Sequence, residues 1–141
     1  MRVSKVDGKY VLALYKGDEV VDCLNEFCKK ERIFGGYFLG IGACESIELG
    51  TYNVEEKKYY KKKFESGLYE ITNLSGNVTS EKIHMHVTIA EPESCKAFGG
   101  HLIWAKINPA LEIVLVPFSS ELQREHDEKS GLDLLKLDEE I

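Results

Sequence analysis

Two histidines in one short segment have the residue type and spacing to bind a metal ion. His84 and His86 lie in residues 83–90, where apolar and polar side chains alternate as in a β-strand with one buried face. Side chains at positions i and i+2 of a strand point to the same side, with Cα atoms roughly 6.5–7 Å apart. That spacing allows two imidazoles to converge on one ion.

A third histidine is predicted to join them across a hairpin. Residues 91–96 are polar and contain a proline, so they suit a loop leading into the next strand-like run, 97–105. A hairpin centred on this loop places His101 directly opposite His86, and opposed residues share a face with Cβ atoms about 4.5–5.5 Å apart. We therefore expect His84, His86 and His101 to form a three-nitrogen cluster.

Three histidines with an open coordination position commonly hold catalytic zinc, with water as the fourth ligand. Nickel, copper, cobalt and iron also accept nitrogen ligands, so we expect a divalent metal, with zinc the first choice. The alternative is a group of hydrogen-bonded histidines on a sheet face, without metal. The pattern locates a site, but it does not identify a reaction or decide whether the protein is an enzyme.

Metal-bound imidazoles need hydrogen-bond partners that orient them. Glu70 is the candidate for this role, or for a general base if the site is catalytic. Glu45 and Glu48, beside a glycine-rich segment, are weaker candidates. The alternative for Glu70 is an ordinary surface or interface carboxylate. His126 stands in the acidic C-terminal segment and is expected to be solvated.

Length and composition predict one domain with a hydrophobic core. The chain has 141 residues, of which 43% are hydrophobic and 30% charged. No apolar run reaches the roughly 18 residues of a membrane span, and the first residues lead into no signal-peptide core. We therefore expect no membrane association and a cytoplasmic location. The four cysteines form no Cys-x-x-Cys pair, so we expect reduced thiols.

Negative charge is concentrated at the C-terminal end. The net charge is −6, and residues 119–141 carry eight acids against three bases. We therefore divide the chain into a domain, 1–118, and an acidic tail, 119–141, packed on it or extending from it. A domain that binds nucleic acid by itself usually carries a basic face, so this balance argues against a DNA-binding function.

One basic segment keeps nucleic acid as an alternative partner. Five lysines surround Tyr59 and Tyr60, and cations among aromatic rings are typical of proteins that bind single strands. Lysines on an exposed strand also prevent edge-to-edge aggregation, and we favour this simpler interpretation. The five are Lys57, Lys58, Lys61, Lys62 and Lys63.

One helix and many strands are expected to position these residues. Asp18 is a suitable N-cap, and apolar spacing predicts a helix from there to about residue 30 or 31. Strand patterns cover residues 10–15, 35–43, 45–52, 59–64, 68–78, 83–90, 97–107 and 111–117, with a break at 108–109 and a short strand at 132–137. We predict an α+β fold with a largely antiparallel sheet that is closed on itself or covered by another subunit. Trp104 is expected on the strand face of Phe98 and Leu102, in the core or a subunit interface.

Several short motifs follow one another in a specific order between about residues 11 and 118. They are Gly40-Ile41-Gly42-Ala43 with Ile47-Glu48-Leu49-Gly50-Thr51-Tyr52, Gly67-Leu68-Tyr69-Glu70-Ile71 with Leu74-Ser75-Gly76, and His84-Met85-His86-Val87 with Phe98-Gly99-Gly100-His101-Leu102. In this order they resemble the plants-and-prokaryotes-conserved (PPC) domain. The resemblance implies an α+β fold with an antiparallel sheet and a trimeric assembly.

The resemblance also implies a DNA-binding label, which comes from plant members with a basic AT-hook arm ahead of this domain. No Arg-Gly-Arg-Pro arm occurs in this sequence, so that function does not carry over directly. Plant members tend to lack histidines where His84, His86 and His101 stand, so the chain resembles the archaeal and bacterial single-domain members.

We therefore expect a homotrimer that binds zinc or another divalent metal ion and that acts on or binds a small molecule. If it is an enzyme, metal-assisted hydrolysis or another Lewis-acid reaction fits best. The alternative is a DNA-binding or regulatory module that acts through DNA or protein partners.

Overall fold

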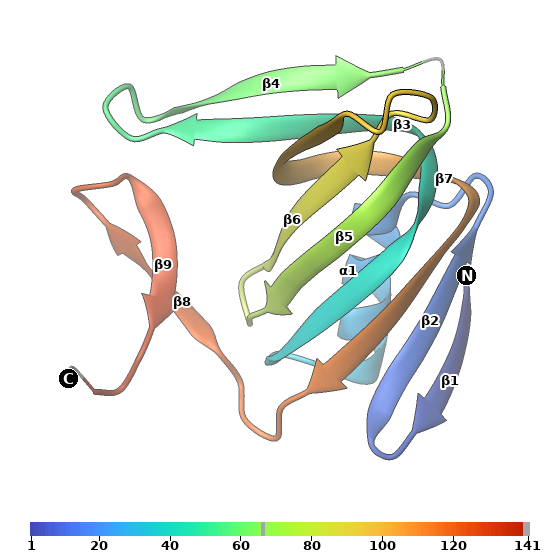
Figure 1. Cartoon of the computed structure of the whole chain (residues 1–141). Coiled ribbons are helices and arrows are strands. Elements are labelled where there is room, and N and C mark those ends of the chain that lie inside the picture. The colour runs from blue at the N-terminus through green and yellow to red at the C-terminus, as the bar shows by residue number, and fades with distance from the viewer. Residues whose placement is uncertain (66, 140–141) are drawn as a thin grey trace.

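The computed structural model describes residues 1–65 and 67–139, which form nine strands and one helix (Figure 1). In chain order these are β1 (Arg2–Val6), β2 (Lys9–Tyr15), α1 (Val20–Glu31), β3 (Gly36–Asn53), β4 (Lys58–Phe64), β5 (Tyr69–Val78), β6 (Ile83–Ala90), β7 (Ala97–Pro117), β8 (Gln123–Asp127) and β9 (Leu132–Lys136). Strands β1 to β7 make one sheet, and β8 and β9 pair with each other in a second, two-stranded sheet.

The large sheet is antiparallel and closes on itself. Its strand order is β1-β2-β7-β6-β5-β3-β4, and β7 also pairs with β3, so that β7, β6, β5 and β3 form a ring. Closure is achieved because β3 and β7 are 18 and 21 residues long and curl around the molecule, pairing with different neighbours along their lengths (Figure 1). The predicted α+β class, with a largely antiparallel sheet and one main helix, is confirmed.

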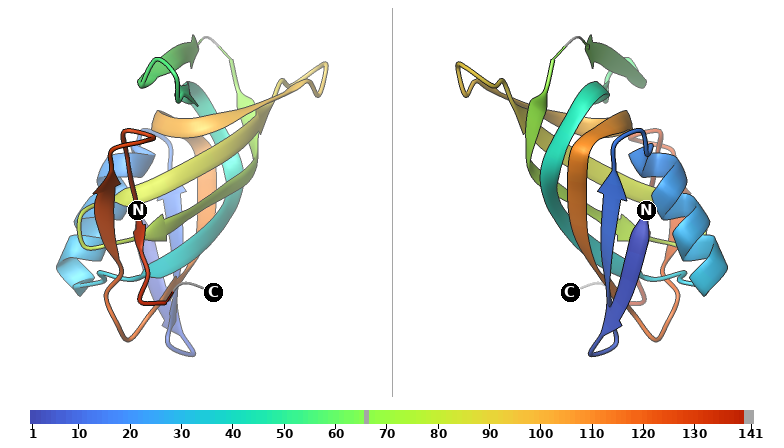
Figure 2. Two further views of the ribbon diagram at one scale, coloured as in Figure 1. Left: turned by 90° about the vertical axis from the view of Figure 1, so that its left-hand side faces the viewer. Right: turned by 90° about the vertical axis from the view of Figure 1, so that its right-hand side faces the viewer.

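The core lies on the inner side of this curved sheet and extends to α1. Phe38 on β3 and Ile113 on β7 are fully buried there. The helix lies along one side of the sheet (Figure 2) and buries residues at helical spacing, among them Val20, Leu24 and Phe27. Among the described residues, no helix is long and apolar enough to cross a membrane. The four cysteines are free thiols.

The helix ends where the sequence predicts but begins with a different N-cap. Glu19, not Asp18, caps it, and its carboxylate accepts hydrogen bonds from the backbone N–H groups of Val21 and Asp22 at 3.1 and 2.8 Å. The Asp18 carboxylate instead accepts the Tyr15 N–H at 2.9 Å and lies 2.9 Å from the N-terminal amine. Asp is a favoured N-cap residue type, but the Asp18 carboxylate is held by Tyr15 and the N-terminal amine, and Glu19 caps the helix instead.

Two strand breaks expected from the sequence are absent. Residues 35–43 and 45–52 belong to the single strand β3, and β7 continues through the cis peptide bond of Asn108–Pro109. Register shifts in the β3–β7 pairing, including one between Gly42 and Cys44, take up these irregularities. Conversely, β1 and β8 gave no sequence signal, because neither strand has an alternating buried face.

Trp104 does not share the buried face of Leu102, contrary to that part of the prediction. The β3–β7 register shifts between Leu49, opposite Leu102, and Glu48, opposite Trp104. Ile103 is therefore an extra residue that reverses the alternation, so Leu102 is buried while Trp104 is half-buried and donates its indole N–H to Glu48 at 3.0 Å. A bulge of this kind leaves no mark in the sequence pattern.

One outer face of the sheet is apolar. Tyr37, Leu39 and Ile41 on β3 are 46%, 54% and 62% exposed. The strand predicted over residues 35–43 is therefore buried only on its opposite face, which carries Phe38. Leu39 lies in register with Val114 of β7, which in turn lies beside Val11 of β2. These five residues form the apolar face.

Candidate metal centre

Three histidines meet on the side of the sheet that faces away from the core. Along β6, Met85 and Val87 point inward and are buried, so His84 and His86 point outward. β6 pairs with β7 such that His86 lies directly opposite His101, as predicted. The three residues each offer one ring nitrogen, and these nitrogens lie within 4.8 Å of one another. The ring centroids are separated by 4.9, 5.0 and 5.7 Å.

Glycines allow the strands around the cluster to approach closely. A Cβ on Gly100, the residue before His101, would lie 2.7 Å from the carbonyl oxygen of Gly50 on β3. A Cβ on Gly76 of β5 would lie 2.3 Å from the carbonyl oxygen of His84. Because both contacts are to backbone atoms, which cannot move aside as a side chain can, these two positions require glycine.

The protein environment keeps two of the imidazoles neutral. Burial lowers the pKa of His84 from its ordinary value of 6.5 to about 4, with smaller contributions from His101, His86 and the positive charges of Arg124 and Lys82. Burial also lowers the pKa of His101, assisted by His86 and Lys82. A neutral imidazole has the free lone pair that a metal ligand needs, so both residues are ready to bind an ion at neutral pH.

The lowered pKa of His84 predicts how the stability of the metal-free protein depends on pH. The unfolded chain takes up a proton near pH 6.5, whereas the folded chain resists protonation until about pH 4. The contribution of neutral His84 to the free energy of unfolding is therefore fully present above pH 6.5. It is lost as the pH falls from 6.5 to about 4. Because His84 is partly exposed, we expect a loss of only about 1 kcal/mol in the free energy of unfolding.

Urea unfolding with a chelator present, at about pH 7 and about pH 4.5, measures this change. The His84→Gln variant is the comparison, and it should lose less stability between the two pH values than the wild type. An identical loss in both proteins would contradict the assignment to His84.

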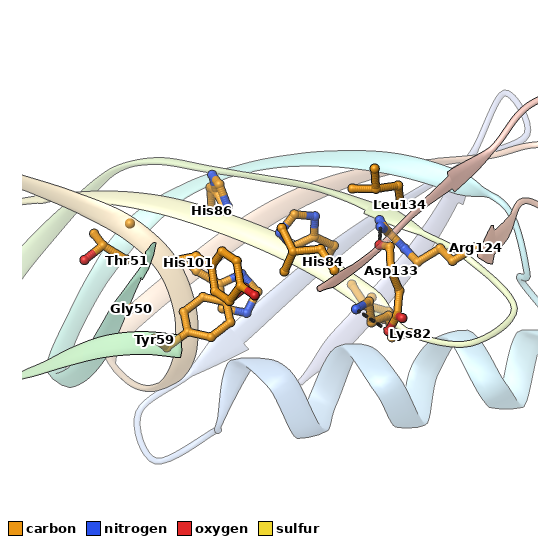
Figure 3. Close-up of a pocket in the computed structure, with 14 residues that line it drawn as sticks. Gly50, Thr51, Tyr59, Lys82, His84, His86, His101, Arg124, Asp133 and Leu134 are labelled. Carbon is orange, nitrogen blue, oxygen red and sulfur yellow. Dashed lines mark hydrogen bonds and ion pairs between the residues drawn. The ribbon is translucent and has the colours of Figure 1, made fainter. Parts of the chain in front are cut away.

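A cavity of about 530 Å³ lies beside the cluster (Figure 3). Tyr52 and Tyr59, from the β3–β4 pair, form part of its wall, and the Tyr59 ring lies 5.3 Å from that of His101. The β8–β9 hairpin contributes Arg124 and Leu134 on another side. The three histidines therefore form part of the wall of a cavity, with His86 at its exposed side.

Hydrogen bonds hold the β8–β9 hairpin over this cavity from two sides. Toward β5, the Arg124 guanidinium donates to the Asn77 side-chain oxygen at 2.7 Å. Toward β3, the Tyr52 hydroxyl donates to the backbone carbonyl of Ser130 at 2.9 Å. Much of the predicted acidic tail is thus ordered and part of the site, while its last two residues, 140 and 141, lie outside the described residues. His126, on β8, is half-exposed and lies 3.1 Å from an Asp133 oxygen.

The structure does not bring the predicted carboxylates to the histidines. Glu70 is exposed on β5 and borders a separate cleft. Glu45 accepts a hydrogen bond from the Asn108 side chain at 3.0 Å, and Glu48 accepts one from Trp104. None of the three is among the described residues that line the histidine cavity.

Sequence reasoning missed most of the cavity wall. Lys82, Arg124 and Asp133 reach it from the β5–β6 turn and from the C-terminal hairpin. The sequence indicates Tyr59 only as part of the basic segment and not as a neighbour of His101. Only the long-range pairing of β3 with β7 and the fold-back of the hairpin bring these residues together, and neither has a local sequence signal.

Most lysines of the basic segment already have partners. Lys57 donates to a backbone carbonyl of the hairpin at 2.7 Å, and Lys58 pairs with Glu56. The Lys62 ammonium lies over two phenylalanine rings, at 5.1 and 5.3 Å from their centroids. These rings are therefore covered by a cation and are poor platforms for stacking bases.

The sequence profile of the Plants and Prokaryotes Conserved (PCC) domain matches residues 1–119. This chain belongs to that family. The same family is also abbreviated PPC, so the match confirms the resemblance to the PPC domain. The matched region ends before β8. No curated protein is similar enough to this PPC-domain chain to match it.

Solved structures resemble the PPC-domain chain over nearly its whole length. A candidate DNA-binding protein from Bacteroides thetaiotaomicron is 32% identical, with a TM-score of 0.89 and 96% of each chain covered. A metal-containing protein from Archaeoglobus fulgidus is 33% identical, with a TM-score of 0.82 and 96% of each chain covered. A PPC protein from Pyrococcus horikoshii is 25% identical, with a TM-score of 0.82, and the match covers 98% of this chain and 95% of that one. Coverage this high extends past residue 119 into the hairpin.

Proposed function

We propose that this PPC-domain protein binds one divalent metal ion per chain, with zinc the first choice, through His84, His86 and His101. The convergence of three ring nitrogens within 4.8 Å of one another carries the proposal. Zinc–nitrogen bonds of about 2.0–2.1 Å place two ligands of one ion at most about 4.2 Å apart, so small side-chain rotations suffice to bind it.

The donor set fits such an ion. Nδ1 of His101 is buried and has no hydrogen-bond partner among the described residues. A buried polar nitrogen without a partner is costly, and a nearby ligand is one way to satisfy it. A similar protein, from Archaeoglobus fulgidus, is described as metal-containing, which supports the proposal without identifying the ion.

A metal ion in this place supplies Lewis-acid chemistry, of which hydrolysis of a small molecule is the commonest form. His84, His86 and His101 would hold the ion, and the β8–β9 hairpin borders the cavity beside them. We assign the cluster a binding role and name no catalytic residue, because no carboxylate of the sequence prediction lies at the cavity.

Elemental analysis of purified protein tests the proposal. Protein prepared without chelators should contain close to one metal ion per chain, lose it on chelation and regain it when zinc is added. Folded protein that takes up no zinc, cobalt or nickel would contradict the proposal.

We also propose that the chain assembles into a homotrimer through the apolar face. Monomers rarely leave a contiguous apolar surface of this kind uncovered, and Leu39 and Val114 lie side by side at its centre. Leu39→Glu should weaken self-association by about tenfold or more, because it places a charge among apolar side chains. Leu137→Glu, the same change at a 70% exposed leucine outside this face, should have no effect.

Sedimentation across a concentration series measures both variants. A wild-type protein that stays monomeric at micromolar concentration would contradict the assembly, and an unchanged Leu39→Glu trimer would contradict the location of the interface.

A second candidate is a DNA-binding or regulatory module. The similarity to the candidate DNA-binding protein from Bacteroides thetaiotaomicron favours it, as do the exposed Lys61 and Lys63 on β4. Duplex binding measured over a salt series is the test, since phosphate contacts give a steep dependence of affinity on salt. Absence of binding at low salt would remove this candidate.

A further inference from the structure

The cavity beside the histidines has a positive end. Arg124 and Lys82 border it, and Asp133 is the only acid among the described residues that line it. In Figure 3 these three side chains gather at one end of the cavity, next to His84. Asp133 lies 3.3 Å from the Lys82 ammonium and balances its charge. The positive charge of Arg124 is then not balanced by any acid among the described lining residues.

The Arg124 guanidinium is fixed in place by neutral groups. It donates to the Asp133 backbone carbonyl at 2.8 Å and to the Asn77 amide oxygen at 2.7 Å, while its Nε has no partner among the described residues. The nearby Glu81 carboxylate accepts the backbone N–H of Arg124, not its guanidinium. A guanidinium has five N–H donors and a planar shape that suits carboxylates, so a charged binding group is held ready at the cavity.

A metal ion at the cluster would add to this positive charge. Three neutral imidazoles contribute no negative charge, so a divalent ion held by them keeps its full charge. The cavity would then require an anion for charge balance, and the described lining supplies only Asp133.

The rest of the wall is apolar and the cavity is of ligand size. Ile83, Leu132, Leu134 and the rings of Tyr52 and Tyr59 line it. Small-molecule sites typically enclose about 300–1,000 Å³ with mostly apolar walls, and this one measures about 530 Å³. Because the hairpin is bonded on two sides, the cavity suits a small molecule better than an extended chain.

We propose that this cavity binds a small monocarboxylate with an apolar body, the carboxylate facing Arg124 and the body lying against the tyrosine and leucine side chains. The proposal rests on the proposed metal site for part of the positive charge, but Arg124 is present with or without the ion. Binding is therefore measured in both metal-loaded and metal-free protein, which separates failure of the carboxylate site from failure of the metal site.

Benzoate and its neutral counterpart benzamide are the probes. Their binding is measured by calorimetry and by chemical-shift changes of the protein. Benzoate should bind the metal-loaded protein with a Kd of about 1 mM or below, at least about tenfold more tightly than benzamide. The metal-free protein should bind benzoate more weakly and still prefer it to benzamide. Inorganic phosphate, as a second anion, should bind more weakly than benzoate because it leaves the apolar wall uncovered.

Three variants test the role of Arg124. Arg124→Gln should lose at least about tenfold in benzoate affinity, because the variant replaces a charge-assisted hydrogen bond to the carboxylate by a neutral one. Arg124→Lys keeps the positive charge and should retain the preference for benzoate over benzamide. This variant shows whether a loss of affinity in Arg124→Gln comes from the missing charge or from a displaced β8–β9 hairpin. Arg2→Gln, a change on β1, should bind benzoate as the wild type does.

Zinc affinity of the Arg124 variants should stay close to that of the wild type. Equal affinity for benzoate and benzamide, no loss in Arg124→Gln, or tighter binding of phosphate than of benzoate would each overturn the carboxylate proposal. Any of these results would leave the metal site standing if zinc still binds.

Discussion

Replacing His86 by alanine should weaken zinc binding by on the order of 100-fold or more while leaving the protein folded. His86 is exposed on the outer face of β6 and contributes nothing to the core, so its loss removes one ligand nitrogen without opening a cavity. The two remaining imidazoles, His84 and His101, would hold the ion far less tightly. Competition with a chelator of known zinc affinity measures the change.

His126→Ala is the matched control. It is the same substitution at a half-exposed histidine on β8, outside the cluster. Zinc affinity should be unchanged in this variant, and both variants should unfold at about the wild-type urea concentration when metal-free. Wild-type zinc affinity in His86→Ala would remove the three-histidine site.

Replacing Gly76 by alanine should lower the free energy of unfolding by about 2–3 kcal/mol. The added Cβ would lie 2.3 Å from the carbonyl oxygen of His84 and 2.5 Å from the ring of Phe38, which is fully buried. Since neither atom can move away freely, β5 and β6 must separate where they pair. We expect zinc affinity to fall as well, because this shift displaces His84. Urea unfolding measures the first effect.

Gly67→Ala provides the comparison for this prediction. A Cβ there would make only ordinary contacts, the nearest being 3.6 Å from the Tyr69 ring. Its stability should stay close to that of the wild type. If Gly76→Ala were equally harmless, the close approach of β5 to β6 would not be a structural requirement.

The histidine cluster was predictable because its geometry depends on local sequence. Alternation along residues 83–90 places His84 and His86 on one face, and the short loop that follows fixes the register that brings His101 opposite His86. Helix α1 was predictable for the same reason, since the spacing of Leu24 and Phe27 depends only on helix geometry.

The cavity around the cluster was not predictable, because long-range pairing builds it. Gly50 comes to lie opposite His101 only when β3 curls back onto β7. Arg124 reaches Asn77 across 47 residues of sequence, and its strand is stabilised by its partner and not by an apolar pattern. Bulges such as the one at Ile103 reverse the faces of side chains without any change in composition.

Anomalous diffraction from crystals of zinc-loaded protein, recorded on both sides of the zinc absorption edge, tests the central claim most directly. We predict one strong peak per chain, within bonding distance of a ring nitrogen from each of His84, His86 and His101. Well-ordered imidazoles with no peak between them, or a peak held by other residues, would contradict it.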